Sequence, residues 1–319
     1  MTDELHLNSY DNTPVFTIKT VVQEIGIPPA TLRAWERRYG VLSPGRSEGG
    51  YRLYSERDIA ILRWLKRQVD AGVSISRAAA LLGIRHPGGE AETAPLSART
   101  ELPDGARSPS ALSDDLLNAL MAFDEARAHA LLGEAFAIYP VEQVAEEILT
   151  PSLVEMGERW HRGEATVVQE HFATATLRRR LSVMFHAYDQ PAAGPLAITG
   201  SAPTEWHDVG ILLVSLALRR NGWRVIYLGQ NVPTDQLLQE IRRLHPDLVC
   251  LSATTREGAM SLTQVYAEVA ALPAPRPRLV FGGRAFNLAP DLRDRFTGAY
   301  VSASARDLIA ALKQPPQFR

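Results

Sequence analysis

Apolar residues recur at helical spacing over residues 18–84 and 112–188, and from residue 195 onward short apolar runs alternate with amphipathic stretches. Helical spacing predicts helices that bury one face, whereas short apolar runs between such helices predict parallel strands. The last part of the chain is therefore expected to form a doubly wound parallel sheet. Its expected strands are residues 196–199, 224–228, 248–252, 279–282 and a short one at 300–301.

The first 84 residues predict a winged helix-turn-helix. Thr17 can cap a first helix that Gly26 ends, and Pro28–Pro29 suits the first turn of a second helix. A glycine-rich stretch follows and then alternates apolar and basic residues, which predicts a hairpin, or wing. The expected elements are helices over 18–24, from 28 onward, 55–71 and 74–82, with the wing over 43–54.

The remaining organisation follows from shifts in composition. Residues 1–14 are expected to form a flexible tail, and residues 85–110, rich in Pro, Gly, Ser and Glu, a linker. Helical patterning over 111–190 predicts a four-helix bundle, and residues 195–316 hold the strand and helix alternation. The expected fold class is multidomain α and α/β, with a winged helix-turn-helix over 15–84, the bundle and the doubly wound sheet.

The chain has 319 residues, of which 45% are hydrophobic and 22% charged, as in ordinary globular proteins of two or three domains. No apolar run is long enough to span a bilayer, and residues 1–12 do not resemble a signal peptide. The single cysteine, Cys250, lies in an apolar run and is expected to be buried. These features favour a cytoplasmic protein without membrane association.

Charge is distributed unevenly along the chain. Residues 15–84 hold 11 Lys and Arg but 6 Asp and Glu, whereas the whole chain has a net charge of -2. A basic module joined to an acidic remainder is typical of a protein whose first part binds a polyanion. The alternative is a small helical module with a solvated basic face.

Two segments, TLRAWERRYG at 31–40 and GGYRLY at 49–54, resemble the MerR family of winged helix-turn-helix regulators. The resemblance implies binding to double-stranded operator DNA, with the second helix in the major groove and the wing on phosphates and the minor groove. The residues expected to contact DNA are Arg33, Arg37, Arg38, Arg46, Tyr51 and Arg52. Trp35 and Tyr39 are expected in the core, and Glu36 is expected to orient an arginine.

A polar loop, residues 205–210, follows the first expected strand of the sheet and precedes an apolar helix. His207 can offer one imidazole nitrogen to a metal while Glu205 takes the proton of the other nitrogen, which fixes the tautomer. Gly210 lets the start of the helix approach a large flat ligand. The loop, Asp208 included, is a candidate site for a metal-bearing cofactor. The alternative is an ordinary loop histidine.

This loop, residues 251–255 and residues 281–283 resemble, in this order, the motifs of the Rossmann-like cobalamin-binding domains of methionine synthase, corrinoid methyltransferase proteins and mutases. The resemblance implies that His207 displaces the cofactor's own benzimidazole base as the lower ligand of cobalt. A slot for the freed tail would be formed by Ser252, Thr254, Gly282 and Gly283. The chain departs from the family pattern in having Glu205 rather than Asp, and Ala253–Thr254 after the serine.

The helical region holds a third motif, in which Trp160 is followed ten residues later by Glu170–His171. This spacing resembles that of the light-sensing cobalamin repressors of the CarH and LitR type. The resemblance implies that the bundle covers adenosylcobalamin, with Trp160 against the adenosyl group, Glu170 hydrogen-bonded to it and His171 lining the cavity. It also implies that His161 ligates cobalt from above after photolysis. Taken alone, Trp160 is typical of a bundle core and Glu170 of a solvated surface.

Together the resemblances imply a MerR-family, cobalamin-dependent, light-sensing transcriptional repressor rather than an enzyme. In such a protein, dark dimers or tetramers loaded with adenosylcobalamin bind operator DNA with high avidity. Light breaks the cobalt–carbon bond, the assembly dissociates, and genes that often serve carotenoid synthesis or light protection are released. Two alternatives are a regulator of the same fold that does not respond to light and a corrinoid protein that carries a methyl group.

Overall fold

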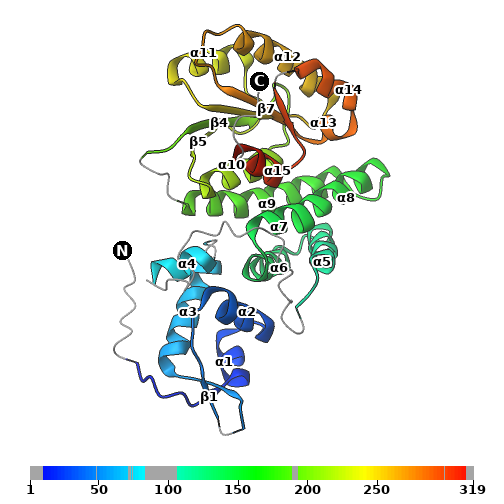
Figure 1. The fold of residues 1–319 in the computed structure, drawn as a ribbon. Coiled ribbons are helices and arrows are strands. Elements are labelled where there is room, and N and C mark those ends of the chain that lie inside the picture. The colour runs from blue at the N-terminus through cyan, green and yellow to red at the C-terminus, as the bar shows by residue number, and fades with distance from the viewer. Residues whose placement is uncertain are drawn as a thin grey trace. The chain divides into compact units, whose positions relative to one another are not determined.

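The computed structural model describes residues 10–47, 49–70, 73, 75–82, 106–188, 193–297 and 299–313, drawn in colour in Figure 1. By their contacts the residues divide into two units, Met1–Glu170 and His171–Arg319, and each is described by itself. The expected tail over 1–14 and linker over 85–110 fall largely outside the described residues. In the described part, no helix is both long and apolar enough to cross a membrane.

The first unit begins with the expected winged helix-turn-helix. The hydroxyl of Thr17 accepts a hydrogen bond from the backbone of the first turn and so caps α1 (Ile18–Ile25), which ends at Gly26 with a φ of 72°. The second helix, α2 (Pro29–Tyr39), begins on a proline and ends at Gly40, also left-handed. Both helices therefore end where glycine adopts a positive φ that other residues rarely tolerate.

Three short antiparallel strands form the wing and its support. β2 (Gly45–Arg46) and β3 (Arg52–Tyr54) make the expected hairpin. β1 (Phe16–Thr17), which the sequence pattern did not predict, pairs with the other edge of β3. The third and fourth helices follow as α3 (Glu56–Asp70) and α4 (Ile75–Leu81).

Apolar side chains from α2, α3 and α4 fill the centre of this module. Trp35 and Tyr39 are buried in it, as predicted, because the helical repeat places them on the same side of α2 as Leu32. Tyr54, the last residue of β3, is fully buried too, so the wing is attached to the helical core at this end. Arg37 of α2 is exposed to solvent.

Four helices and a π-helical turn complete the first unit. They are α5 (Pro109–Met121), α6 (Glu125–Ile138), α7 (Val141–Val144), the π turn (Ala145–Leu149) and α8 (Thr150–His161). The π turn ends two residues before Pro151, which lacks the N–H that an α-helix would use, and the wider turn accommodates it. The buried hydroxyls of Ser113 and Ser152, 3.0 Å apart, join α5 to α8.

Most of α9 (Val167–Ala187) belongs to the second unit, from His171 onward. Its C-terminal end is bound by α10 (Val209–Arg220), because the Arg219 guanidinium donates to the Phe185 carbonyl at 2.6 Å and lies over the Phe185 ring. A cation stabilises the last carbonyls of a helix. The sequence pattern groups residues 111–190 as one bundle, whereas the contacts divide this stretch after residue 170.

A five-stranded parallel sheet lies at the centre of the second unit (Figure 1). Its strands β4 to β8 are Leu196–Ser201, Arg224–Tyr227, Leu248–Ser252, Arg278–Gly282 and Tyr300–Ser302. All five correspond to predicted strands. The spatial order is β5-β4-β6-β7-β8, so the direction of winding reverses between β4 and β6.

Helices cover both faces of this sheet, which confirms the doubly wound architecture. α10 and α15 (Ala305–Lys313) pack together on one face, and α11 (Thr234–Leu244) and α12 (Arg256–Ala270) on the other (Figure 1). Short helical segments α13, α14 and η3 follow β7, over Arg284–Leu288, Pro290–Arg293 and Asp294–Phe296. In such sheets ligands bind at the carboxyl ends of the strands where the winding reverses. That place lies between β4 and β6.

Candidate cofactor and nucleic-acid sites

The carboxylate of Glu205 joins the loop after β4 to the end of β6. Its Oε1 accepts a hydrogen bond from the His207 N–H at 3.0 Å and lies 2.6 Å from His207 Nδ1. Its Oε2 accepts hydrogen bonds from the backbone N–H and the hydroxyl of Thr254, at 2.7 and 2.5 Å. Three residues that the sequence singled out therefore meet at the reversal of strand order.

Glu205 is a buried anion with only 2% of its surface exposed. Burial by itself raises the pKa of this carboxyl, but hydrogen bonds from His207 and Thr254 outweigh burial and lower the pKa to about 2. The carboxylate therefore stays ionised at neutral pH. An ionised acceptor beside Nδ1 selects the imidazole tautomer that carries its proton on Nδ1.

The imidazole of His207 is 59% exposed, in contrast to the buried carboxylate behind it. Since Nδ1 faces Glu205, a metal bound by this ring would be bound through Nε2. Among the described residues, no group of three or more His, Cys, Asp or Glu side chains forms a site for a bare metal ion. A single, well-supported imidazole suits a metal that brings its other ligands within a cofactor.

Polar residues at the carboxyl ends of the strands hold the loop in place. The hydroxyl of Ser201 donates to the His207 carbonyl at 3.0 Å and lies 3.4 Å from the hydroxyl of Ser252. Asn231 accepts a hydrogen bond from a loop N–H at 2.8 Å, and Gln230 donates to a loop carbonyl. Sequence reasoning singled out Ser252 but missed Ser201, Gln230 and Asn231. Their positions at the end of β4 or shortly after β5 could have indicated that they lie at this edge of the sheet.

Asp208, predicted to contact the cofactor, is buried and faces two other elements. Its Oδ1 lies 2.9 Å from Arg178 Nε on α9, and its Oδ2 accepts a hydrogen bond from the Tyr227 hydroxyl at 2.9 Å. Burial, and then the charge of Asp208, raise the pKa of Tyr227, so its hydroxyl retains the proton that it donates. The structure therefore places this carboxylate between α9 and β5 rather than at a ligand surface.

The glycines predicted at the site have different local roles. A Cβ on Gly283, whose φ is 102°, would lie 2.4 Å from the Ala253 carbonyl oxygen, and one on Gly282 would lie 3.1 Å from that of Ser302. These two positions need glycine for the packing of neighbouring strand ends, independently of a ligand. A Cβ on Gly210 would meet nothing within 4 Å, so the start of α10 is open there, as a flat ligand requires.

The residues predicted above the cofactor lie at the end of α8 and the start of α9. The indole of Trp160 is 44% exposed, and its ring centroid lies 4.7 Å from that of the exposed His161. Glu170 is half-buried in the first turn of α9, and His171 is exposed. Trp160 is therefore not a bundle-core residue, and its ring is accessible to a ligand or a partner.

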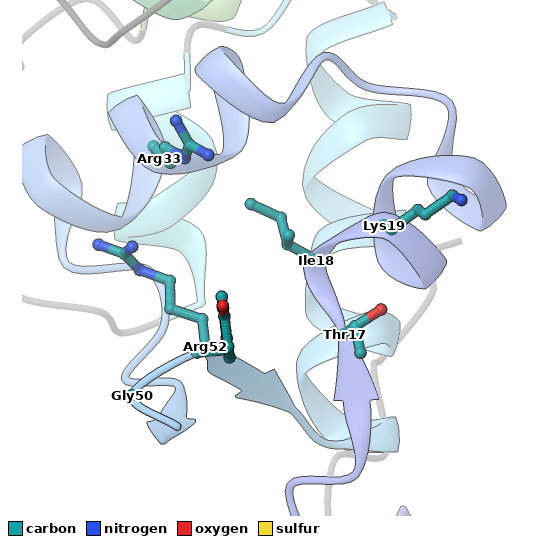
Figure 2. Close-up of a pocket in the computed structure, with 7 residues that line it drawn as sticks. Thr17, Ile18, Lys19, Arg33, Gly50 and Arg52 are labelled. Carbon is teal, nitrogen blue, oxygen red and sulfur yellow. The ribbon is translucent and has the colours of Figure 1, made fainter. Parts of the chain in front are cut away.

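In the winged module, a hollow of about 260 Å³ opens between α1, α2 and the wing. Figure 2 shows Arg33 of α2 and Arg52 of the wing at one side of this hollow, and Thr17 of β1 and Lys19 of α1 at the other. Arg33 and Arg52 lie together at one side of the hollow, whereas the Lys19 ammonium points away from them, so the rim of the hollow is a basic surface suited to phosphates of nucleic acid. Sequence reasoning missed Lys19, although its place in the first turn of α1 indicates this position.

The other predicted DNA contacts are accessible where the structure describes them. Tyr51 is 77% exposed on the wing, and Arg37 and Arg46 are exposed. Arg46 also donates to the Gly50 carbonyl at 3.3 Å, a bond that shapes the wing. The side chain of Arg38 lies outside the described part of the chain.

Glu36 connects α2 to the wing. Its Oε2 lies 3.0 Å from Arg52 Nε, and its Oε1 accepts a hydrogen bond from the Tyr54 hydroxyl at 2.5 Å. The prediction that Glu36 orients an arginine is confirmed by this geometry. Glu36 thus connects the two parts of the basic surface, α2 and the wing, through buried contacts.

Comparisons with known proteins match the regions of the chain that hold both candidate sites. A model of the MerR HTH family regulatory proteins matches residues 16–83, and two B12 binding domain models match residues 112–184 and 195–313. The HTH-type transcriptional repressor CarH of Myxococcus xanthus is 37% identical over 276 residues, 85% of this chain and 89% of CarH. The repressor CarA of the same organism is 31% identical over 300 residues, 93% of this chain and 96% of CarA. The chain belongs to the CarH and CarA family.

Corrinoid proteins of Methanosarcina barkeri are also similar to part of this chain. The trimethylamine corrinoid protein of Methanosarcina barkeri is 25% identical and covers 61% of this chain and 92% of its own length. The solved structure of the monomethylamine corrinoid protein of the same organism covers 64% of this chain and 98% of its own, with a TM-score of 0.54 and 19% identity. This second likeness shows a shared fold.

Proposed function

We propose that this chain is a transcriptional repressor whose DNA binding is controlled by cobalamin held at His207. The observation that carries the proposal is the joining of Glu205, His207 and Thr254 at the reversal of strand order. The B12 binding domain match over the same stretch, the MerR match and the similarity to the repressors CarH and CarA support it.

Each residue of the cofactor site has a distinct task in this proposal. His207 would hold the cobalt of the cofactor through Nε2, while Glu205 holds the proton on Nδ1 and makes Nε2 a better donor. Thr254 fixes the carboxylate from the opposite strand end. Ser252, at the end of β6, would border the space for the tail of the cofactor together with Gly282 and Gly283 at the end of β7. Cobalamin would supply a cobalt ion that accepts a nitrogen ligand.

We further propose that the bound form is adenosylcobalamin and that light is the signal. Adenosylcobalamin supplies a cobalt–carbon bond that green or blue light breaks. Trp160 and Glu170 would contact the adenosyl group, with His161 and His171 beside them. The exposed indole of Trp160 and the nearby ring of His161 support this assignment, because a purely structural tryptophan would be buried.

The regulatory output in this proposal is binding to an operator. Dark association into dimers or tetramers would bring several winged modules to one stretch of DNA, and the gain in effective concentration would multiply their affinity. Loss of the assembly in the light would then release the DNA. The basic hollow beside α2 and the wing supplies the phosphate contact of each module.

Full-length protein loaded with cobalamin in the dark tests the proposal. We compare the protein before and after green light, once with adenosylcobalamin and once with methylcobalamin. The measurements are the absorption spectrum, the elution volume in gel filtration and the mobility shift of DNA from upstream of the chain's own gene. We expect the adenosyl form to change its spectrum, to elute as a smaller species and to lose DNA on illumination. Failure to take up any corrinoid would overturn the proposal.

The same experiment separates two other functions. Cobalamin uptake with equal DNA affinity in dark and light would indicate a regulator that does not sense light. Cobalamin uptake without any DNA binding would favour a carrier of methyl groups, which the likeness to corrinoid proteins makes a specific alternative. The basic winged module argues against the carrier, since methyl transfer has no use for it.

A further inference from the structure

Asp208 occupies the N-cap position of α10 but makes no capping hydrogen bond. Aspartate is favoured at this position because its carboxylate normally accepts hydrogen bonds from the first N–H groups of a helix. In this chain the two carboxylate oxygens are directed to Arg178 and Tyr227 instead. Asp208 therefore gives up the capping role that its position favours. This indicates that its contacts with Arg178 and Tyr227 are required by the tertiary structure.

The three side chains form one connected unit, which we call the Asp208 bridge. The carboxylate of Asp208 is 5% exposed, and the Arg178 side chain is 36% exposed. A buried carboxylate needs charged or hydrogen-bonding partners, and Arg178 and Tyr227 supply one to each oxygen. Removal of either partner would leave the charge partly uncompensated, so the three residues act together.

The Asp208 bridge connects the histidine loop to two other elements of the second unit. Asp208 directly follows His207, so fixing its carboxylate fixes the backbone that presents the imidazole. Tyr227 ends β5, and Arg178 lies in the middle of α9. His171 lies two turns before Arg178 on the same side of α9, about 10.5 Å along the helix axis.

We propose that Arg178, Asp208 and Tyr227 are positioning residues, which hold the His207 loop against α9 and so set how His207 and His171 face a bound corrinoid. This inference rests on the proposed binding of cobalamin at His207. The three residues act through the backbone of residues 207 and 208 and are not ligands themselves. The bridge makes α9 and the loop one rigid piece, so displacement of one displaces the other.

Full-length variants test the Asp208 bridge. Arg178→Gln, Asp208→Asn and their combination remove the ion pair, and Tyr227→Phe removes one hydrogen bond while it keeps the ring. Arg243→Gln is the matched control, because Arg243 is an exposed arginine paired with Glu240 on α11 of the same unit. Far-UV circular dichroism and thermal unfolding establish that each variant is folded.

Three measurements are made on these proteins. Hydrogen–deuterium exchange without cofactor reports the mobility of residues 205–211. Absorbance titration in the dark gives the Kd for methylcobalamin. Electron paramagnetic resonance of the Co(II) form, with 15N-labelled histidine, shows whether a histidine nitrogen is the axial ligand.

We expect Arg178→Gln and Asp208→Asn to speed exchange over residues 205–211 and to raise the Kd about tenfold each, with no further rise in the double variant. The resonance spectra of these variants should show a reduced fraction of histidine-ligated cobalt. Tyr227→Phe should change the same quantities in the same direction by less. Arg243→Gln should match the wild type in all three.

Two results would overturn the inference. One is unchanged exchange over residues 205–211 in folded variants, and the other is faster exchange with a Kd within about twofold of the wild type. Failure of the wild type itself to bind methylcobalamin would instead refute the proposed function. In that case the exchange comparison still decides whether the Asp208 bridge holds the loop.

Discussion

Oε2 of Glu36 lies 3.0 Å from Nε of Arg52, and this ion pair links α2 to the wing. The Glu36 side chain is only 7% exposed, and its other oxygen is taken by the Tyr54 hydroxyl. The ion pair uses only Nε of Arg52. It therefore fixes the direction of the guanidinium group, while the two terminal nitrogens can contact another group. An acid in the middle of a basic surface therefore orients an arginine that we propose contacts DNA.

Glu36→Gln is expected to weaken DNA binding, although it removes a negative charge beside the phosphates. Coulomb attraction alone would make the variant bind more tightly. Loss of the charge-assisted bond to Arg52 should outweigh this and reduce affinity about tenfold. Mobility-shift titrations check the prediction against Glu24→Gln, an equal charge change at an exposed pair with Arg63. Equal affinity of the two variants would contradict it.

Lys19→Gln is expected to reduce DNA affinity on every sequence alike. Lys19 lines the basic hollow together with Arg33 and Arg52, where a phosphate contact carries no base information. The slope of log affinity against log salt should become shallower by about 0.9, the value for one lost phosphate contact. Lys66→Gln, which removes a lysine paired with Asp70, should keep the wild-type slope. An unchanged slope for Lys19→Gln would remove it from the interface.

Thr254→Val is expected to weaken cobalamin binding about tenfold, and Glu205→Gln by up to about a hundredfold, as for other residues that support a metal-bound histidine. The first change removes one hydroxyl bond to the carboxylate and keeps the backbone bond. The second removes the charge that selects the tautomer. Absorbance titration of the full chain gives both values, with Thr263→Val as a control because that hydroxyl bonds only within α12. Wild-type affinity in Glu205→Gln would contradict the assigned role.

The low pKa of Glu205 predicts acid sensitivity of the cofactor-free protein. Folding lowers this pKa from 4.5 to about 2, so the unfolded chain takes up a proton at higher pH than the folded chain. The stabilisation is fully present above pH 4.5, and the free energy of unfolding falls as the pH drops from there towards 2. Urea unfolding at about pH 5 and pH 3 should therefore show a smaller loss for Glu205→Gln than for the wild type. Identical losses would assign the sensitivity to other carboxylates.

Much of the fold follows from local patterns. Thr17 and Gly26 delimit α1 because a cap and a left-handed glycine act within one turn of the helix. The five strands of the sheet were recognised because buried parallel strands are short apolar runs between amphipathic helices. The site residues Glu205, His207 and Thr254 were recognised from motif order, and the sheet explains why that order brings them together.

Other features depend on partners distant in sequence. β1 is two residues long and exists only because β3 offers it an edge. Asp208 has the local preference of a helix cap, and its actual partner Arg178 precedes it by thirty residues on another helix. The glycine at 283 suggested a ligand, yet the neighbouring Ala253 carbonyl already excludes a side chain there. Such pairings are set by tertiary packing, which no local pattern contains.

The contacts of α9 with the sheet domain determine which fragment of this protein could be fused to a different effector domain. The second B12 domain match begins at residue 195, which suggests a graft that starts at the first strand of the sheet. Such a fragment would lack Arg178 and Phe185, and would leave the Asp208 carboxylate and the Arg219 guanidinium without their helix. A transplanted cobalamin-binding piece should therefore keep α9 with the sheet, and a transplanted light sensor should also keep Trp160 and His161 of α8.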